Sequence, residues 1–145
     1  MSSRQTTQIL EGLQSQKTGY AQLLELAKKQ KAAIDTDDET RLLQLIQSKE
    51  QLLRALRETE QTLKESSDSL SNEAKKALPP QAKELQNEVL RLMEQLIQIE
   101  NECAESLKSK ALGTRDELAD LKNRKQSIKQ YGMPGTKGTE FSGDA

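Results

Sequence analysis

Residues 80–130 read PQAKELQNEVLRLMEQLIQIENECAESLKSKALGTRDELADLKNRKQSIKQ, the longest helical pattern in the chain. Apolar residues recur along it mostly at spacings of three and four: Ala82, Leu85, Val89, Leu92, Leu96, Ile99, Cys103, Leu107, Ala111, Leu118, Leu121 and Ile128. Such spacing places the side chains on one face of a helix. The stretch therefore predicts a single helix, roughly 75 Å long at a rise of roughly 1.5 Å per residue.

Two shorter helices are predicted before this one, at 6–33 and 37–66. Both carry leucine-rich stripes close to a heptad rhythm. Between them, Thr36 and Glu39 have the spacing of a capping box, in which each side chain satisfies the other's backbone donor, so the second helix should begin there. Because the link is so short, the two helices are expected to form an antiparallel hairpin. By the same rise, the first helix reaches only roughly 42 Å.

The long stretch contains a change of phase. Cys103, Leu107 and Ala111 are separated by four and four residues, after a regular alternation of three and four, which inserts a stutter into the pattern. Gly113 follows shortly afterwards and lowers the helix propensity. We therefore expect a hinge at 107–113.

The expected fold is all-α. An antiparallel hairpin packs in coiled-coil fashion on the first half of an extended third helix, and residues 1–130 form one helical domain. Residues 131–145 hold four of the seven glycines and one of the three prolines, so they are expected to form a flexible tail.

Composition favours long helices and argues against an enzyme. Hydrophobic residues make up 33% of the chain, and the only aromatic residues are two tyrosines and one phenylalanine, too few for a core of large side chains. The chain has no histidine, the commonest general base and metal ligand. It also has no glycine-rich phosphate-binding motif. We expect no catalysis, no cofactor and no metal ion.

Charge and hydropathy argue against nucleic acid and membrane as partners. The 22 basic and 23 acidic residues are interspersed, so no basic stripe predicts nucleic-acid binding. The local run 122–125, Lys-Asn-Arg-Lys, is interpreted as a solvated helix end. No apolar run approaches the roughly 18 residues that a membrane span needs. The N-terminus lacks the apolar region of a secretory signal, and a lone cysteine cannot form an intrachain disulfide. These features predict a cytoplasmic protein without membrane insertion.

The apolar stripe beyond the expected reach of the hairpin is the candidate partner surface. It comprises Leu107, Leu112, Leu118, Leu121 and Ile128. These residues have three possible fates: they fold back on the chain, form a homodimer seam, or receive the amphipathic helix of another protein. The last two together are favoured over the first.

Tyr131 is the second candidate contact, where the predicted helix gives way to the glycine-rich tail. Tyrosine is over-represented among the residues that dominate interface energies. Packing of Tyr131 on its own helix is an equally good interpretation of the pattern.

The order of these features resembles the FlgN-type flagellar export chaperones over nearly the whole chain. The resemblance is carried by the acidic turn after Ala33-Ile34-Asp35 and by the leucine-rich stretch that contains Ser48-Lys49-Glu50-Gln51-Leu52-Leu53. It also includes the long last helix and the pair Tyr131-Gly132 at the start of the tail. The serine-rich end of the second helix departs from the family pattern, since some members carry arginines there.

The resemblance implies a non-enzymatic chaperone for the hook-associated proteins of the hook–filament junction. It implies that the end of the last helix binds the client and prevents its premature assembly, with the hinge letting this half fold around a client helix. It also implies that Tyr131 and Gly132 dock on the cytoplasmic domain of the export-gate protein. One alternative is a homo-oligomeric coiled-coil adaptor or scaffold with no export role, in which the long helix is the dimer seam. Another is a chaperone of the same class for a different flagellar substrate, such as the filament cap.

Overall fold

The computed structural model describes residues 3–109 and 115–130, with the side chains of residues 4–109 and 121–129. These residues form five helices and no strand, which confirms the all-α prediction: α1 (Ser3–Asp35), α2 (Glu39–Asp68), α3 (Asn72–Lys76), α4 (Pro80–Ser109) and α5 (Arg115–Gln130).

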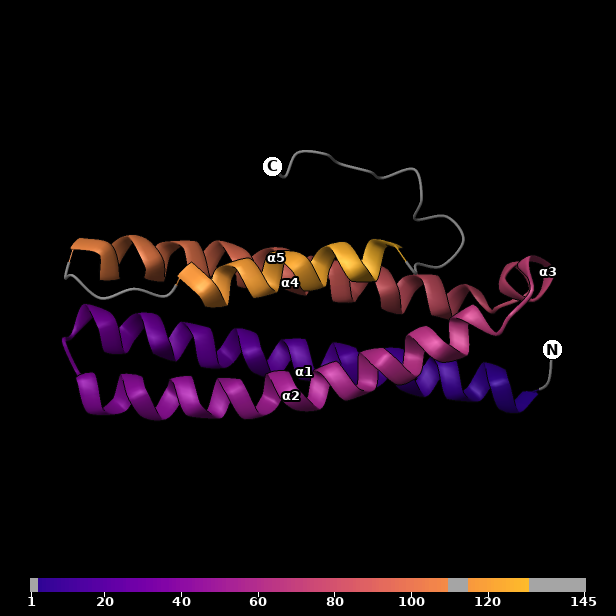
Figure 1. The fold of residues 1–145 in the computed structure, drawn as a ribbon, viewed down its shortest axis with the longest axis horizontal. Coiled ribbons are helices and arrows are strands. Elements are labelled where there is room, and N and C mark those ends of the chain that lie inside the picture. Colours follow the sequence, from indigo (N-terminus) through magenta and orange to yellow (C-terminus); the bar gives the residue numbers. More distant parts are fainter. Residues whose placement is uncertain (1–2, 110–114, 131–145) are drawn as a thin grey trace.

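The four long helices lie side by side in an elongated bundle and alternate in direction along the chain (Figure 1). α1 and α2 form the predicted antiparallel hairpin, and α1 also packs along α4. α4 begins at Pro80, as the sequence predicts, because proline is tolerated in the first turn of a helix. The short helix α3 lies in the connection between α2 and α4.

The prediction of one extended helix over 80–130 is wrong. α4 ends at Ser109, and α5 begins at Arg115 and runs back along α4 (Figure 1). α4 thus ends within the hinge predicted at 107–113, of which residues 110–113 lie outside the described residues. Reversal of the chain here lets the second half of the apolar stripe pack on the helices that already exist. A straight continuation would leave that stripe exposed to water.

The turn between α1 and α2 is capped differently from the expectation. α1 continues to Asp35, so Thr36 follows its last turn and donates its hydroxyl to the carbonyl of Ala32 at 2.9 Å. The N-cap of α2 is Asp38, whose carboxylate accepts from the backbone N–H of Arg41 at 3.1 Å. The predicted capping box of Thr36 with Glu39 is therefore wrong, because α1 ends two residues after its predicted end at residue 33 and Asp38 is the N-cap of α2.

Two glycines set the spacing of the hairpin. A Cβ atom on Gly19 would lie 2.7 Å from Cδ2 of Leu56, and one on Gly12 would lie 3.2 Å from Cδ1 of Leu63. Both leucines are buried and lie on α2. The glycines weaken α1 as a helix, but they let α2 approach it more closely than any other residue would permit.

Candidate functional site

The last helix is held on the bundle by the apolar residues that the sequence analysis assigned to a partner. Leu121 is 3% exposed and Ile128 is 1% exposed, and both join the main core cluster with residues of α1, α2 and α4. The stripe at these two positions is therefore covered by its own chain. Folding back, the fate that the sequence favoured less, is the one seen in this structure.

An arginine lies between these two anchors. Arg124 is only 6% exposed. Its Nη1 donates to Oε1 of Glu60 on α2 at 2.6 Å, and its Nη2 donates to the main-chain oxygen of Leu53, also on α2, at 2.8 Å. The planar guanidinium is suited to such a forked contact. Arg124 thus ties α5 to α2 through both a charge and a backbone carbonyl.

The second oxygen of Glu60 is held by α1. Its Oε2 accepts from the hydroxyl of Tyr20 at 2.6 Å and from Nε2 of Gln16 at 3.0 Å. Burial, reinforced by the negative charge of Glu60, raises the pKa of Tyr20 far above its usual value. The phenol therefore stays protonated at physiological pH and remains a donor. One carboxylate, at the side of the bundle, joins α1, α2 and α5.

A second ion pair lies at the edge of the same helix. Nζ of Lys125 is 3.0 Å from Oε1 of Glu94 on α4. The Glu94 side chain is 60% exposed, so water screens this pair and it adds little to stability. It nevertheless marks where the exposed edge of α5 meets α4.

The interpretation of residues 122–125 as a solvated helix end is wrong for Arg124. Lys122 and Asn123 are exposed, but Arg124 is buried. The sequence did contain a signal, because Arg124 follows Leu121 by three residues and precedes Ile128 by four. It therefore occupies a position on the apolar stripe itself, where a long charged side chain needs a buried partner. The identity of that partner, Glu60, has no such local signal.

Leu107 lies apart from the other candidates. It is 2% exposed and packs in a separate cluster with Ile34, Leu42 and Cys103 near the α1–α2 turn. The structure therefore does not bring Leu107 together with Leu121 and Ile128.

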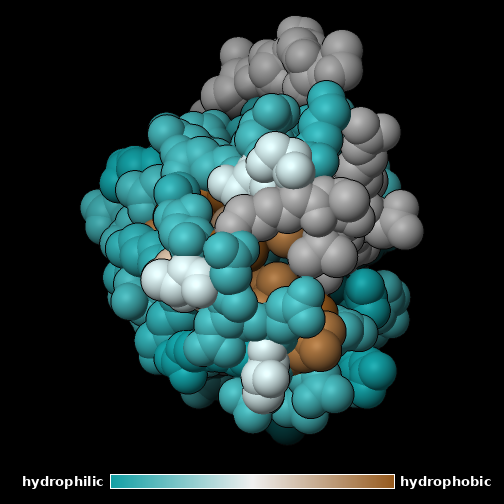
Figure 2. Space-filling view, turned by 90° about the vertical axis from the view of Figure 1, so that its left-hand side faces the viewer, coloured by the Kyte–Doolittle hydropathy of each residue, from teal (hydrophilic) through white to brown (hydrophobic). Residues whose placement is uncertain are grey.

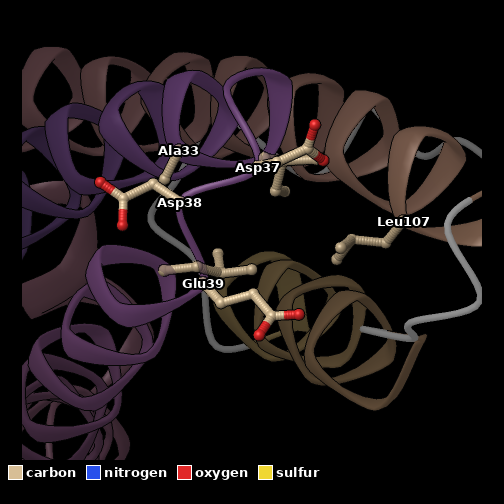
Figure 3. A pocket seen from close by; sticks show the side chains of 7 residues that line it. Ala33, Asp37, Asp38, Glu39 and Leu107 are labelled. Carbon is tan, nitrogen blue, oxygen red and sulfur yellow. The ribbon is translucent and has the colours of Figure 1, made fainter.

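At this end of the bundle the surface is hollowed (Figures 2 and 3). Hydrophobic residues are visible there between hydrophilic ones, as Figure 2 shows. The cavity holds about 200 Å³ and is lined by Ala33, Ile34, Leu42, Leu107, Asp37, Asp38 and Glu39. It is smaller than the roughly 300–1,000 Å³ of typical ligand pockets.

The other predicted site residues lie outside the part of the chain whose side chains are described. Leu112, Tyr131 and Gly132 lie outside the described residues, and Leu118 lies on α5 in the part whose side chains are not described.

Among the described residues, no group of three or more acidic or cysteine side chains could hold a metal ion. Burial raises the pKa of the Cys103 thiol to about 11, so it is a poor nucleophile at neutral pH. Within the same ranges, no helix is long and apolar enough to cross a membrane.

The fold defines an all-α protein of four long helices in one bundle, with α5 packed on the side of the other three. The family follows from the sequence: the chain belongs to the FlgN family, whose model, described as FlgN protein, matches residues 1–139. This is a family of flagellar export chaperones that bind flagellar substrate proteins, so the chain is a chaperone of flagellar type III export. Searches among curated proteins and among solved structures gave no match.

Proposed function

We propose that the chain binds hook-associated proteins of the hook–filament junction in the cytoplasm, keeps them from assembling prematurely, and delivers them to the export gate. Family membership supports the chaperone role. The observation that supports the mechanism is the covered stripe of α5, because a surface that must meet a client is here packed on its own chain. Client binding then requires α5 to leave the bundle.

α5 is short and has few described buried side chains, which favours its release from the bundle. The helix has 16 residues, close to the length at which an isolated helix is marginal in water. Its described buried side chains are only Leu121, Arg124 and Ile128. Elements that open locally are those with few buried apolar contacts. Once α5 is released, Leu121 and Ile128 become available to the client. We propose that Leu112 and Leu118, assigned to the same stripe by the sequence, contact the client as well.

The position of the proposed docking residues links the two steps of the function. Tyr131 and Gly132 follow α5 directly in the chain. A client that moves α5 therefore also moves the residues proposed to contact the cytoplasmic domain of the export-gate protein. This linkage would make docking depend on whether a client is loaded, since the two sites share one helix.

The experiment is to lock α5 in place and measure client binding. The Lys125–Glu94 pair marks two side chains that meet at the exposed edge of α5, so a Lys125→Cys/Glu94→Cys variant can be joined by a reducible bismaleimide. Cys103 is buried and does not interfere. The hook-associated proteins of the same bacterium should bind the open protein by titration calorimetry. They should lose at least ten-fold in affinity for the linked form and recover it after reduction.

Each single-cysteine variant treated with the same reagent is the control, and both should bind as the unmodified protein does. If no hook-associated protein binds the open protein, the proposed client is wrong. If binding is equal in the linked and reduced forms, the client proposal stands but the release of α5 does not. A dimer that persists at low micromolar concentration in light scattering would instead favour the homo-oligomeric adaptor.

A further inference from the structure

The surface under α5 carries a charge as well as apolar area. Leu121 and Ile128 bury apolar side chains on either side of the ionic contact from Arg124 to Glu60. The side chain of Glu60 is 14% exposed with α5 in place. Any helix that replaces α5 on this surface would cover the same carboxylate.

We propose that this surface selects a partner helix that carries an arginine three residues after one apolar anchor and four residues before the next, so that the arginine takes the place of Arg124 on Glu60. This inference rests on the proposed release of α5, and it concerns a client segment other than the one that contacts the stripe of the released helix. The pattern is that of α5 itself, Leu121-x-x-Arg124-x-x-x-Ile128.

The selection arises because a covered carboxylate needs a counter-charge. With α5 in place, the side chain of Glu60 is 14% exposed and Arg124 supplies a counter-charge. A helix that covers the carboxylate without supplying a cation removes that counter-charge while still keeping water away, which is unfavourable. Glu60 therefore acts mainly against the wrong helix, and exclusion of wrong partners is a general source of specificity.

The carboxylate is also positioned before any partner arrives. Tyr20 and Gln16 hold its Oε2 from α1, and neither residue belongs to the helix that leaves. Oε1 then remains directed toward the incoming side chain. Arginine should be preferred over lysine, because the second guanidinium nitrogen also reaches the main-chain oxygen of Leu53. A lysine ammonium offers no such planar fork.

The test uses the full chain and a defined peptide. Leu121→Asp with Ile128→Asp in the protein places two charges in the apolar contact of α5 and displaces the helix, while the rest of the bundle keeps its helical circular dichroism. The probe is a labelled, end-capped peptide of residues 115–130, RDELADLKNRKQSIKQ, compared with the same peptide carrying Arg124→Gln. By fluorescence anisotropy, the arginine peptide should bind at least ten times more tightly than the glutamine peptide.

Two further substitutions in the receptor separate recognition from general attraction of a basic peptide. Glu60→Gln should abolish the preference for arginine. Glu58→Gln removes an exposed carboxylate two positions earlier on the same helix and should leave the preference unchanged. Equal binding of the two peptides, or a preference that survives Glu60→Gln, would overturn the proposal. So would the absence of binding by either peptide at millimolar concentration.

Replacing arginine by glutamine in a client tests the arginine selection separately from the proposed function. In a hook-associated protein that binds the wild-type chain, replacing the arginine at this spacing by glutamine should weaken binding at least ten-fold, and the loss should disappear with the Glu60→Gln chaperone. A client that binds but is insensitive to every such replacement contradicts the arginine selection alone. Failure of all hook-associated proteins to bind contradicts the proposed function.

Discussion

Nζ of Lys49 lies 2.5 Å from Oε2 of Glu100, and neither side chain is more than 2% exposed. Gln30 completes the contact, because its Oε1 accepts from Lys49 at 2.7 Å and its Nε2 donates to the other oxygen of Glu100 at 3.1 Å. One residue each from α1, α2 and α4 therefore forms a closed polar cluster in the interior. Such a cluster is favourable only while every member has its partner.

Replacing one member of this cluster should be far more damaging than replacing the charged pair. Lys49→Met leaves Glu100 buried without its cation, and we expect a loss of about 3–5 kcal/mol in the free energy of unfolding. Lys49→Met with Glu100→Leu removes both charges and should recover most of that loss. Urea denaturation followed by circular dichroism measures both. A double variant as unstable as the single one would show that the ion pair itself, rather than the orphaned charge, supplies the stability.

Gly19→Ala should destabilise the protein even though alanine favours helix. The added methyl group would meet Cδ2 of Leu56 at 2.7 Å, and its overpacking, costing about 1–3 kcal/mol, outweighs a propensity gain of roughly 1 kcal/mol. Gly12→Ala, whose nearest contact is 3.2 Å, is the milder control. Thermal unfolding should rank Gly19→Ala below Gly12→Ala. Adding Leu56→Ala to Gly19→Ala should cost less than the sum of the single changes.

Cys103 should resist alkylation until the protein unfolds. Burial raises the pKa of its thiol from 9.0 to about 11, which lowers the thiolate fraction at pH 8 about 100-fold. Iodoacetamide should therefore react at least about 100 times more slowly with the native chain than with the chain in urea. Equal rates would show that the α1–α4 contact around this thiol opens freely.

The same shift has a consequence for stability at alkaline pH. A pKa that is higher in the folded state than in the unfolded state means that the contribution of Cys103 is complete below pH 9 and is lost as pH rises toward about 11. Cys103→Ala should make the free energy of unfolding fall less steeply between these values. The raised pKa of Tyr20 acts in the same direction at higher pH, so it remains as background in both proteins.

Asp37→Gly should stabilise the hairpin turn. Asp37 has a φ of 56°, the left-handed conformation that glycine adopts without strain. The backbone N–H of Asp37 donates to Ile34 at 3.1 Å, and that of Asp38 donates to Ala33 at 2.9 Å, so the helix ends in a Schellman motif. We expect a gain of roughly 1 kcal/mol. Asp38→Ala, which removes the N-cap of α2, should instead lose about 1 kcal/mol. Thermal unfolding compares the two, and equal effects would contradict the assignment of the strain to Asp37.

The local sequence pattern predicted the hairpin and the start of α4, but it did not predict that the chain reverses direction between α4 and α5. The start of α4 at Pro80 and the hairpin before it follow from proline geometry and from a short acidic link. The reversal after Ser109 does not, because the apolar spacing continues through the break with only a change of phase. Whether such a stretch stays straight or folds back depends on the free energy gained by burying its apolar side chains against the other helices. That gain depends on residues distant in the sequence, so the local pattern does not predict it.

The partners of buried polar residues are also not predicted by the local sequence pattern. Arg124 could be recognised as a charged residue on an apolar stripe, but Glu60 lies 64 positions away in the chain. Burial within the leucine-rich start of α2 is another example, since Leu43 is 63% exposed although leucine is one of the most often buried residues. An apolar stripe broader than the contact face leaves such a choice open, and Leu45 takes the buried position.

The two polar clusters differ in whether they depend on α5. The cluster of Lys49, Gln30 and Glu100 contains no residue of α5, whereas the contact between Glu60 and Arg124 cannot exist without it. Loss of α5 therefore breaks one cluster and leaves the other intact. If α5 leaves the bundle as proposed, the cluster that joins α1, α2 and α4 therefore keeps all three of its residues together.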